Sequence, residues 1–347
     1  MKGIEPKPPD SFGFEEILYR KEGSVATVTI NRPQNYNAYN TPALKELATA
    51  FNDAALDDAI GVIVLTGAGD KAFSTGGDVK EYEDHYTKRP RDYFKYMGLF
   101  KAYIESILYS GKPTIARING MAVGGGNESQ MACDLAVIGE HTFVGQVGTS
   151  VGSVACGGAT QWLPILVGER RAKEMLLLNP RIPARQALDW GLVNRVAPTV
   201  KKNGQTVGNP SPDEIAKANQ GKDGYSVDLS VLDAEVKALA DELLRKFPEC
   251  TRYTRTQTGF WKDLSWHNTV GHARDWLALH FTSAEVHEGM GAFVEKRKTD
   301  YAGLRRKAAE GGSSEYVWGP YAKTCPACGA KRIPSEFEFC GKCGGKL

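Results

Sequence analysis

The stretch Gly124-Gly-Gly-Asn-Glu128 decides how this sequence folds and which chemistry it can support. It follows the apolar run Pro113-Thr-Ile-Ala-Arg-Ile-Asn-Gly-Met-Ala-Val123, which predicts a strand that ends in glycine before a new helix begins. Three residues without side chains leave backbone N–H groups open to a ligand, and a helix start adds unpaired donors and positive dipole. Such a turn can bind an oxyanion through backbone groups, with a carboxylate beside it. The alternative interpretation is that the glycines only form a tight turn.

A second glycine turn follows an earlier predicted strand. The segment Phe73-Ser-Thr-Gly-Gly-Asp-Val-Lys-Glu81 comes after the apolar run Gly61-Val-Ile-Val-Leu-Thr-Gly67. Ligands of α/β folds collect where strand ends meet helix starts, so two such turns can direct two N–H groups at one carbonyl oxygen. The pair therefore predicts an oxyanion site more strongly than either turn does by itself.

Composition limits the classes of protein to which the chain can belong. Its 347 residues, 41% of them hydrophobic, suffice for the core of a globular protein with one large domain or two ordinary ones. A formal net charge of +2 offers no basic field for a nucleic acid. No run approaches the roughly 18 apolar residues of a membrane span, and residues 1–10 lack the apolar part of a secretion signal. We therefore expect a cytoplasmic location with no nucleic acid and no membrane partner.

Hydrophobic periodicity predicts alternating strands and helices. Such alternation indicates a mostly parallel sheet covered by helices. Thr41 is expected to cap the first helix, with Pro42 in its first position. The polar segment 201–225 is expected to be an irregular insertion. The predicted strands are 25–31, 61–66, 113–123 and 134–138, and the clearest predicted helices are 41–55, 93–109, 170–178, 184–190, 229–247 and 267–295.

The order of these motifs resembles the crotonase superfamily, also called the enoyl-CoA hydratase/isomerase family, over about residues 14–301. The resemblance implies an α/β fold with a crotonase-like ββα spiral core and a helical C-terminal trimerisation region, in homotrimers or homohexamers. It assigns residues 1–200 to a core, 201–228 to an insertion and 229–301 to a helical C-terminal region, while composition predicts a linker at 302–324 and four cysteines predict a zinc ribbon at 325–347. The matching motifs are Asn31-Arg-Pro-Gln-Asn-Tyr-Asn-Ala38, Phe73-Ser-Thr-Gly-Gly-Asp78, Ile118-Asn-Gly-Met-Ala-Val-Gly-Gly-Gly-Asn-Glu128, Cys133-Asp134 and Glu288-Gly-Met-Gly-Ala-Phe-Val-Glu-Lys-Arg-Lys298.

The same resemblance implies the residues of an active site. The N–H groups of Gly77 and Gly125 would bind the thioester oxygen of an acyl-CoA substrate, and Glu128 matches one of two hydratase glutamates. Gly148 stands where the second glutamate would be, which puts ordinary hydration of linear enoyl-CoA in doubt.

Coenzyme A is expected only as part of the substrate, without a catalytic cofactor. The resemblance points to the backbone around Asn37 and Ala38, and to Lys296 and Lys298 near the phosphates, in the same subunit or a neighbouring one. The alternative for the two lysines is a basic helix end that complements its own dipole.

A narrower resemblance is to the ring-opening cyclic oxo-enoyl-CoA hydrolases of this superfamily, which act in aromatic degradation. Their reaction adds one water to a conjugated double bond and a second to a ring ketone. Glu128 is the expected base toward water, unless it only caps its helix, and Tyr82, His85 and Tyr86 are candidate proton donors, unless they form a solvated helix face. Cys156 is a pocket-wall residue or a nucleophile. The supporting segments begin at Ser74, Tyr93, Gly145, Asn203, Val227 and Asp275.

Two other functions remain open from the sequence. The chain could be a hydratase or isomerase for another enoyl-CoA, or a noncatalytic scaffold that binds coenzyme A and recruits a partner. Glu128 and both glycine turns argue against the scaffold, whereas the missing second glutamate argues for it.

The last residues carry four cysteines with metal-ligand spacing. Cys325-Pro-Ala-Cys328 and Cys340-Gly-Lys-Cys343 are two C-x-x-C pairs, each able to supply two thiolates from one tight turn. This pattern predicts a zinc ribbon. Four thiolates leave no open position on the metal, which favours a structural ion or the docking of a protein partner over catalysis. Redox use of the pairs is the alternative.

Overall fold

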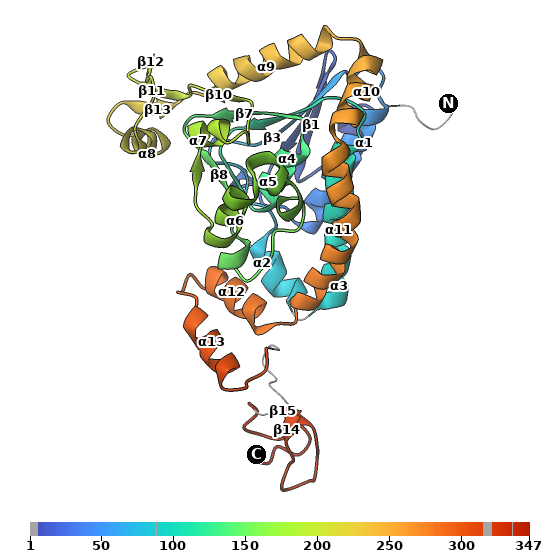
Figure 1. Ribbon diagram of the computed structural model, residues 1–347, viewed down its shortest axis with the longest axis vertical. Coiled ribbons are helices and arrows are strands. Elements are labelled where there is room, and N and C mark those ends of the chain that lie inside the picture. Colours follow the sequence, from blue (N-terminus) through green and yellow to red (C-terminus); the bar gives the residue numbers. More distant parts are fainter. Residues whose placement is uncertain (1–5, 88, 315–320, 335) are drawn as a thin grey trace. The chain divides into compact units, whose positions relative to one another are not determined.

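The structure is a computed structural model, and it describes residues 6–87, 89–314, 321–334 and 336–347 (Figure 1). The chain forms two compact units. The first contains residues 1–78, 96–149 and 155–273, and the second contains residues 79–95, 150–154 and 274–347. Each unit is described by itself.

A six-stranded sheet forms the centre of the first unit. Its first two strands are antiparallel, and every later neighbour pairs in parallel. The strand Val62-Ile-Val-Leu-Thr-Gly67 is buried along its whole length, as a continuous apolar run predicts for a parallel strand covered on both faces. The predicted mostly parallel sheet is confirmed. In spatial order the strands are β1 (Ile17–Glu22), β2 (Val25–Ile30), β3 (Val62–Gly67), β5 (Thr114–Ile118), β7 (Leu135–Gly139) and β10 (Arg195–Ala197).

A second, four-stranded sheet corrects the prediction of one strand over 113–123. The run breaks at Asn119 and Gly120 into β5 of the first sheet and β6 of the second. The Asn119 side chain accepts the Gly67 N–H at 3.0 Å and donates to the Gly69 carbonyl at 2.8 Å. A Cβ on Gly120 would lie 2.4 Å from the backbone of Lys71, so glycine is required at this bend. The sheet contains β4 (Ala72–Ser74), β6 (Met121–Val123), β8 (Phe143–Gly145) and β9 (Ile182–Pro183).

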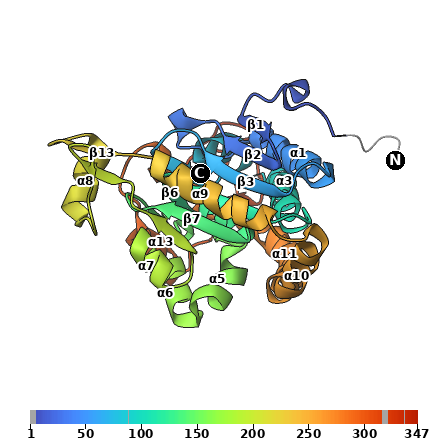
Figure 2. The same cartoon turned by 90° about the horizontal axis from the view of Figure 1, so that it is seen from above.

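Helices cover the central sheet. Figure 2 shows α9 (Ser230–Leu244) lying across one face, where Leu232 and Val236 pack with Val64 and Val137. The first helix, α1 (Thr41–Leu56), begins after Asn40, whose Oδ1 accepts the Ala43 N–H at 2.9 Å. The predicted cap at Thr41 is therefore wrong by one residue. Further helices of this unit are α4 (Gly125–Ala132), α5 (Ala159–Val167), α6 (Glu169–Leu178), α7 (Ala184–Asp189) and α10 (Pro248–Thr258), while α3 (Pro90–Leu108) and α11 (Phe260–His280) contain residues of both units.

Short 3-10 turns occupy Pro9–Phe12, Pro33–Asn35 and Gly148–Ser150. Within the described ranges, no helix has the length and apolar character that crossing a membrane requires.

The segment expected to be irregular has regular structure. It forms a three-stranded sheet of β12 (Gln205–Thr206), β11 (Val200–Lys202) and β13 (Tyr225–Val227), with α8 (Pro212–Gln220) beside it. Ser211 and Glu214 form a capping box at the start of α8, a signal present in the sequence. Both views show this small subdomain beyond β10, at the edge of the central sheet (Figures 1 and 2). Lys71 anchors it by donating to the Asn219 carbonyl at 2.9 Å.

The second unit consists mainly of short helices. The predicted helix over 267–295 is interrupted at Ser283, whose hydroxyl caps the next helix. The segment 302–324, expected to be a linker, begins with helix structure, and Lys307 in it forms an ion pair with Glu336. The elements wholly in this unit are α2 (Val79–Glu81), the π-helical turn η3 (Tyr82–Tyr86), α12 (Ala284–Val294), α13 (Tyr301–Ala309), β14 (Tyr321–Lys323) and β15 (Ile333–Pro334).

Candidate active site

The first glycine turn is held by backbone pairing with the segment before α1. The Tyr39 N–H donates to the Gly76 carbonyl at 2.7 Å, and the Asp78 N–H donates to the Tyr39 carbonyl at 2.9 Å. In a parallel bridge of this kind, the residue between the two bonded ones directs its own N–H to the opposite side. Gly77 is that residue. Its N–H therefore points away from Tyr39 and is available to a ligand.

The second glycine turn lies against the first. Gly124 has φ 56° and ψ −124°, a backbone conformation that favours glycine, and α4 begins at the next residue. A Cβ on Gly76 would lie 2.5 Å from the Gly125 nitrogen, and a Cβ on Gly126 would lie 2.0 Å from the Ser74 carbonyl oxygen. Gly125 is the first residue of its helix, where an N–H has no intrahelical acceptor. The structure thus brings the two predicted glycine turns together at the ends of β4 and β6.

The Glu128 carboxylate is buried beside these turns. Its side chain, 5% exposed, lies in the first turn of α4, and its Oε1 accepts the Ala159 N–H at 3.0 Å. A Cβ on Gly157 would lie 2.8 Å from Oε2, so the second carboxylate oxygen faces a residue without a side chain. Burial raises the pKa of Glu128 to about 7, although N–H groups of Ala159 and Gly157 oppose this shift.

This environment is compatible with two roles for Glu128, helix capping and proton transfer. One oxygen of Glu128 caps the start of α5. The alternative role, helix capping, is therefore seen at α5, and not at α4, the helix that contains Glu128. A carboxyl group whose pKa lies near neutrality can also accept a proton and return it. A buried carboxyl group held in place by backbone N–H groups suits a general acid–base role.

Two aromatic residues that sequence reasoning missed, Phe100 and Tyr39, lie beside these turns. The Phe100 ring lies 3.5 Å from the position of a Cβ on Gly125 and 2.1 Å from that of a Cβ on Gly157. The Tyr39 ring lies 3.5 Å from the same Gly125 position, and its hydroxyl is 2.8 Å from Ser129 Oγ. Burial raises the pKa of Tyr39 to about 12, so its hydroxyl stays protonated. The pair of glycines at 157 and 158 indicates in the sequence that another group approaches the chain closely there. Nothing in the sequence, however, selects Phe100 and Tyr39 from the other aromatic residues.

No carboxylate replaces the missing second glutamate at its own position. Gly148 opens a 3-10 turn, and the nearby Gln146 is almost wholly buried, with Nε2 3.5 Å from the Gly124 carbonyl oxygen. Burial, followed by the charge of Glu128, raises the pKa of the Cys156 thiol to about 12. A thiol that remains protonated at neutral pH is a poor nucleophile, which favours the pocket-wall alternative for Cys156.

The three candidate proton donors lie together in the second unit. Tyr82 and Tyr86 are half-buried in η3, and their rings are 6.2 Å apart, whereas His85 is exposed. Tyr82 also packs against Tyr93, with ring centroids 5.6 Å apart. π-helical turns are rare and often occur at functional sites. The solvated-face alternative fits His85 better than the two tyrosines, while Gly77, Gly125 and Glu128 all belong to the first unit.

The residues expected to bind coenzyme A lie in both units. The Asn37 side chain accepts the Arg32 N–H at 3.0 Å and donates to the Ala72 carbonyl at 2.7 Å. It therefore stabilises its own turn, leaving only the backbone near Ala38 for a ligand. Lys296 and Lys298 are exposed cations that follow α12 in the second unit.

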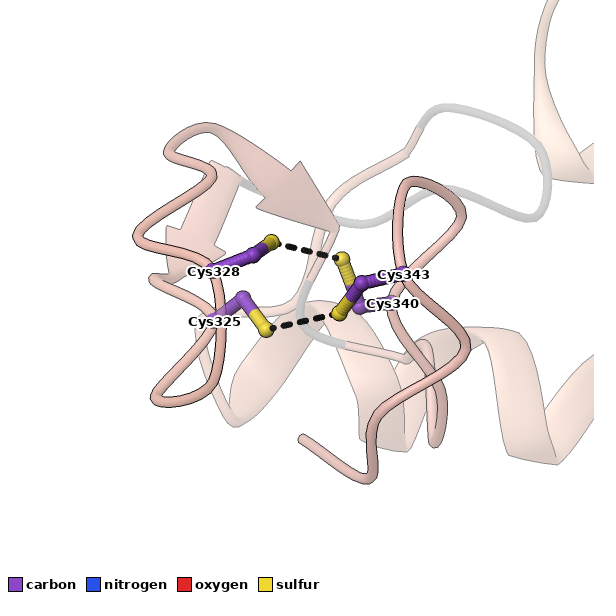
Figure 3. A group of neighbouring side chains, drawn as sticks. All are labelled: Cys325, Cys328, Cys340 and Cys343. Carbon is purple, nitrogen blue, oxygen red and sulfur yellow. Dashed lines mark hydrogen bonds between the residues drawn. The ribbon is translucent and has the colours of Figure 1, made fainter.

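The four C-terminal cysteines form a cluster in the second unit. Figure 3 shows their side chains pointing toward one another from two turns of the chain. The Sγ atoms of Cys325 and Cys343 are 3.6 Å apart, those of Cys328 and Cys340 are 3.7 Å apart, and all four lie within 4.8 Å. A tetrahedral ion with metal–sulfur bonds of about 2.3 Å needs sulfurs about 3.8 Å apart. The Lys342 N–H donates to Cys340 Sγ, and such donors lower the pKa of this thiol to about 6. The cluster can therefore hold a metal ion.

Comparison with known proteins gives consistent matches. The family model described as enoyl-CoA hydratase/isomerase matches residues 20–208. A 6-oxocyclohex-1-ene-1-carbonyl-CoA hydrolase of Geobacter metallireducens is 35% identical over 84% of this chain and 84% of its own length. A hydrolase of the same name from Thauera aromatica is 33% identical over 82% of each chain. An enoyl-CoA hydratase structure from Mycobacterium avium subsp. paratuberculosis shares the fold, with a TM-score of 0.67, 24% identity, and coverage of 83% of this chain and 98% of that one.

Proposed function

The chain belongs to the enoyl-CoA hydratase/isomerase family, and we propose that it hydrolyses a cyclic oxo-enoyl-CoA, opening the ring by C–C cleavage. The crotonase resemblance inferred from the motifs is confirmed. The observation that carries the proposal is a single buried carboxyl group, Glu128, beside two glycine turns, with Gly148 in place of a second glutamate. The names of the relatives, 6-oxocyclohex-1-ene-1-carbonyl-CoA hydrolases, support this substrate class.

Both water additions of this reaction pass through the same kind of intermediate. In the first, Glu128 takes a proton from water, hydroxide adds to the β-carbon, and the electron pair of the double bond moves onto the thioester oxygen. Protonation at the α-carbon completes the hydration. In the second, water adds to the ring ketone, the bond from that carbon to the α-carbon breaks, and its electron pair again forms a thioester enolate. The product gains two waters and carries a new carboxyl group.

The two N–H groups of Gly77 and Gly125 would serve both steps. Each enolate places negative charge on the same oxygen, and a preorganised donor pair stabilises that charge twice. Glu128 would return its proton to the enolate after each step. Tyr82, His85 or Tyr86 would donate a proton to the ketone oxygen as water adds and take it back as the carbon–carbon bond breaks, so that no net proton is consumed, and their place in a π-helical turn supports this role.

The residues proposed to bind coenzyme A are those that the family resemblance implies. We assign the coenzyme A arm to the backbone at Asn37 and Ala38 and its phosphates to Lys296 and Lys298, in one subunit or across neighbours of a homotrimer or homohexamer. Coenzyme A enters as part of the substrate, without a separate catalytic cofactor. The proposed setting is the cytoplasm, with no nucleic acid or membrane partner. We retain the division into core 1–200, insertion 201–228, helical region 229–301, linker 302–324 and ribbon 325–347.

The C-terminal cluster would hold a structural zinc ion. The sulfur separations near 3.7 Å fit tetrahedral zinc, and four thiolates leave no position for a substrate. The metal would stabilise the short ribbon, in whose described part the buried core consists of Cys325, Ile333 and Cys340. A folded ribbon could then dock a protein partner.

One assay separates the possible functions. The protein is incubated with 6-oxocyclohex-1-ene-1-carbonyl-CoA and, separately, with crotonyl-CoA, and the products are weighed by mass spectrometry. A gain of two waters on the cyclic substrate is the expected result. A gain of one water on either substrate would indicate a hydratase, and no change on both would favour the noncatalytic scaffold. The Glu128→Gln variant is the control, and full activity in it would contradict the assignment of the base.

A further inference from the structure

We propose that Gln146 is a positioning residue for the oxyanion site, because its side-chain amide holds the peptide between Gly124 and Gly125 in the orientation that presents the Gly125 N–H. This inference rests on the proposed function of the same site. The residue does not touch the reacting atoms in this scheme, and it acts through the backbone.

Three hydrogen bonds hold the backbone around Gly124, and two of them are made by the carbonyl of the peptide that joins Gly124 to Gly125. The Gly124 N–H donates to the Gly145 carbonyl at 3.1 Å. The Gly124 carbonyl accepts the Glu128 N–H at 3.1 Å and the Gln146 Nε2 at 3.5 Å. In a trans peptide the carbonyl and the following N–H point in opposite directions. Fixing the Gly124 carbonyl on one side therefore fixes the direction of the Gly125 N–H on the other.

This peptide needs such support because glycines flank it. Glycine has access to backbone conformations that other residues avoid, so rotation of the peptide is sterically easy. A rotation that reversed this peptide would turn a carbonyl oxygen, in place of an N–H, toward the negatively charged thioester oxygen. The Gly77 donor is different, because its segment is held by two backbone hydrogen bonds to Tyr39. The side-chain contact of Gln146 thus adds a second bond to the one that the Glu128 N–H makes with the Gly124 carbonyl.

The orientation of the Gln146 amide follows from its surroundings. With Oε1 turned to the Gly124 carbonyl, two acceptors would face each other, so Nε2 is the group that donates. Gln146 is 1% exposed, and among the described residues its Oε1 has no hydrogen-bond partner. The amide of Gln146 therefore bonds to the Gly124 carbonyl through Nε2, in a site shielded from water. A hydrogen bond to the Gly124 carbonyl also polarises the peptide, which makes the Gly125 N–H a stronger hydrogen-bond donor.

The test removes the donor without changing the length of the side chain. Gln146→Met is compared with Gln130→Met, because Gln130 is equally buried but donates to the side chain of Asn127. Each full-length protein is saturated with acetoacetyl-CoA, whose enolate absorbs in the near ultraviolet, and the enolate-to-keto ratio of the bound probe is measured. Thermal unfolding and the kcat and KM on the proposed substrate are recorded alongside.

For Gln146→Met we expect the enolate ratio and kcat to fall by about three- to tenfold, the effect of one neutral hydrogen bond, with KM nearly unchanged. Gln130→Met should keep both values whatever its melting temperature. An unchanged ratio in Gln146→Met, or the same loss in both variants, would overturn the inference. If Gln146→Met does not fold, Gln146→Glu replaces it. Its enolate-to-keto ratio, divided by that of the wild type at the same pH, should recover only at low pH, where the carboxyl group carries a proton to donate. A relative ratio that does not change with pH would overturn the inference.

The same readouts separate this inference from the proposed function. Enrichment of the enolate requires only the two N–H donors, whereas the proposed function requires ring opening. A wild-type protein that enriches the enolate but leaves the cyclic substrate intact would refute the ring-opening function and leave the Gln146 comparison valid. A wild-type protein that does neither would refute both.

Discussion

Adding one methyl group at Gly157 is expected to damage both the stability and the activity of the protein. The new Cβ would lie 2.1 Å from Phe100 Cε1 and 2.8 Å from Glu128 Oε2. Carbon atoms in contact are about 3.5 Å apart, so the ring would have to move by about 1.4 Å. Movement of the ring is restricted, because its neighbouring atom Cζ lies 3.5 Å from the position of a Cβ on Gly125. Overpacking of this kind costs about 1–3 kcal/mol.

The assay for Gly157→Ala is urea denaturation together with turnover of the cyclic substrate. We expect a loss of about 1–3 kcal/mol in the free energy of unfolding, and a fall in kcat because the base and an oxyanion donor share the displaced ring. Gly271→Ala is the matched control, since its Cβ would meet no atom within 4 Å. In the middle of α11 that change should stabilise the protein by up to about 1 kcal/mol.

A second substitution tests the cause. Phe100→Leu removes the edge of the ring, so the double variant should lose less stability than the sum of the single variants, by about 1 kcal/mol or more. Strict additivity would refute the argument that Phe100 and residue 157 compete for the same space. Gly157→Ala with the stability and the activity of the wild type would refute the geometry itself.

Three further predictions follow from single groups. Burial raises the pKa of Glu128 from 4.5 to about 7, so the folded protein keeps a proton that the unfolded chain releases, and the free energy of unfolding should fall by about 3 kcal/mol between pH 4.5 and 7. Urea denaturation across this range should show the fall in the wild type and not in Glu128→Gln. The kcat/KM of the wild type should rise with pH through about 7. Asn40→Ala should cost about 1 kcal/mol in thermal or urea unfolding through loss of the α1 cap, and an equal loss in Thr41→Ala would contradict the observed cap. Cys340→Ser should reduce bound zinc, measured by elemental analysis, below one ion per chain and leave the turnover rate unchanged, because the proposed site lies outside the ribbon.

The sequence predicted features whose cause is local. Glycine runs mark turns that other residues cannot form, and this sufficed to predict both glycine turns, whereas the choice of Gly77 and Gly125 within them came from the family resemblance. The Asn119-Gly120 bend went unnoticed, because it lies inside a run that is otherwise apolar and depends on Asn119 reaching the chain near Gly69. The insertion was judged by its polar composition, although the capping box at Ser211 was readable as a helix start.

The contacts of Glu128 illustrate what a single sequence cannot reveal. Its partner, the Ala159 N–H, is 31 residues away along the chain, and the ring beside it comes from Phe100 in another helix. Neither contact leaves a periodic pattern, because each depends on how β6, α3 and α5 meet in space. The direction of the pKa shift could be anticipated from the apolar neighbours, but the N–H groups that hold the carboxylate could not.

The absence of a carboxylate at position 148 and the burial of Glu128 fit the same chemistry. In the proposed reaction one group must take a proton from water and then give one back, twice in succession. A carboxylate with an ordinary pKa of 4.5 accepts a proton poorly near neutrality, whereas a group with a pKa of about 7 performs both transfers with comparable ease. A second carboxylate nearby would repel the first and raise its pKa further, so that it would hold its proton when water must be activated. One buried glutamate without a charged neighbour at Gly148 is therefore better suited to repeated transfer than a pair would be at the same site.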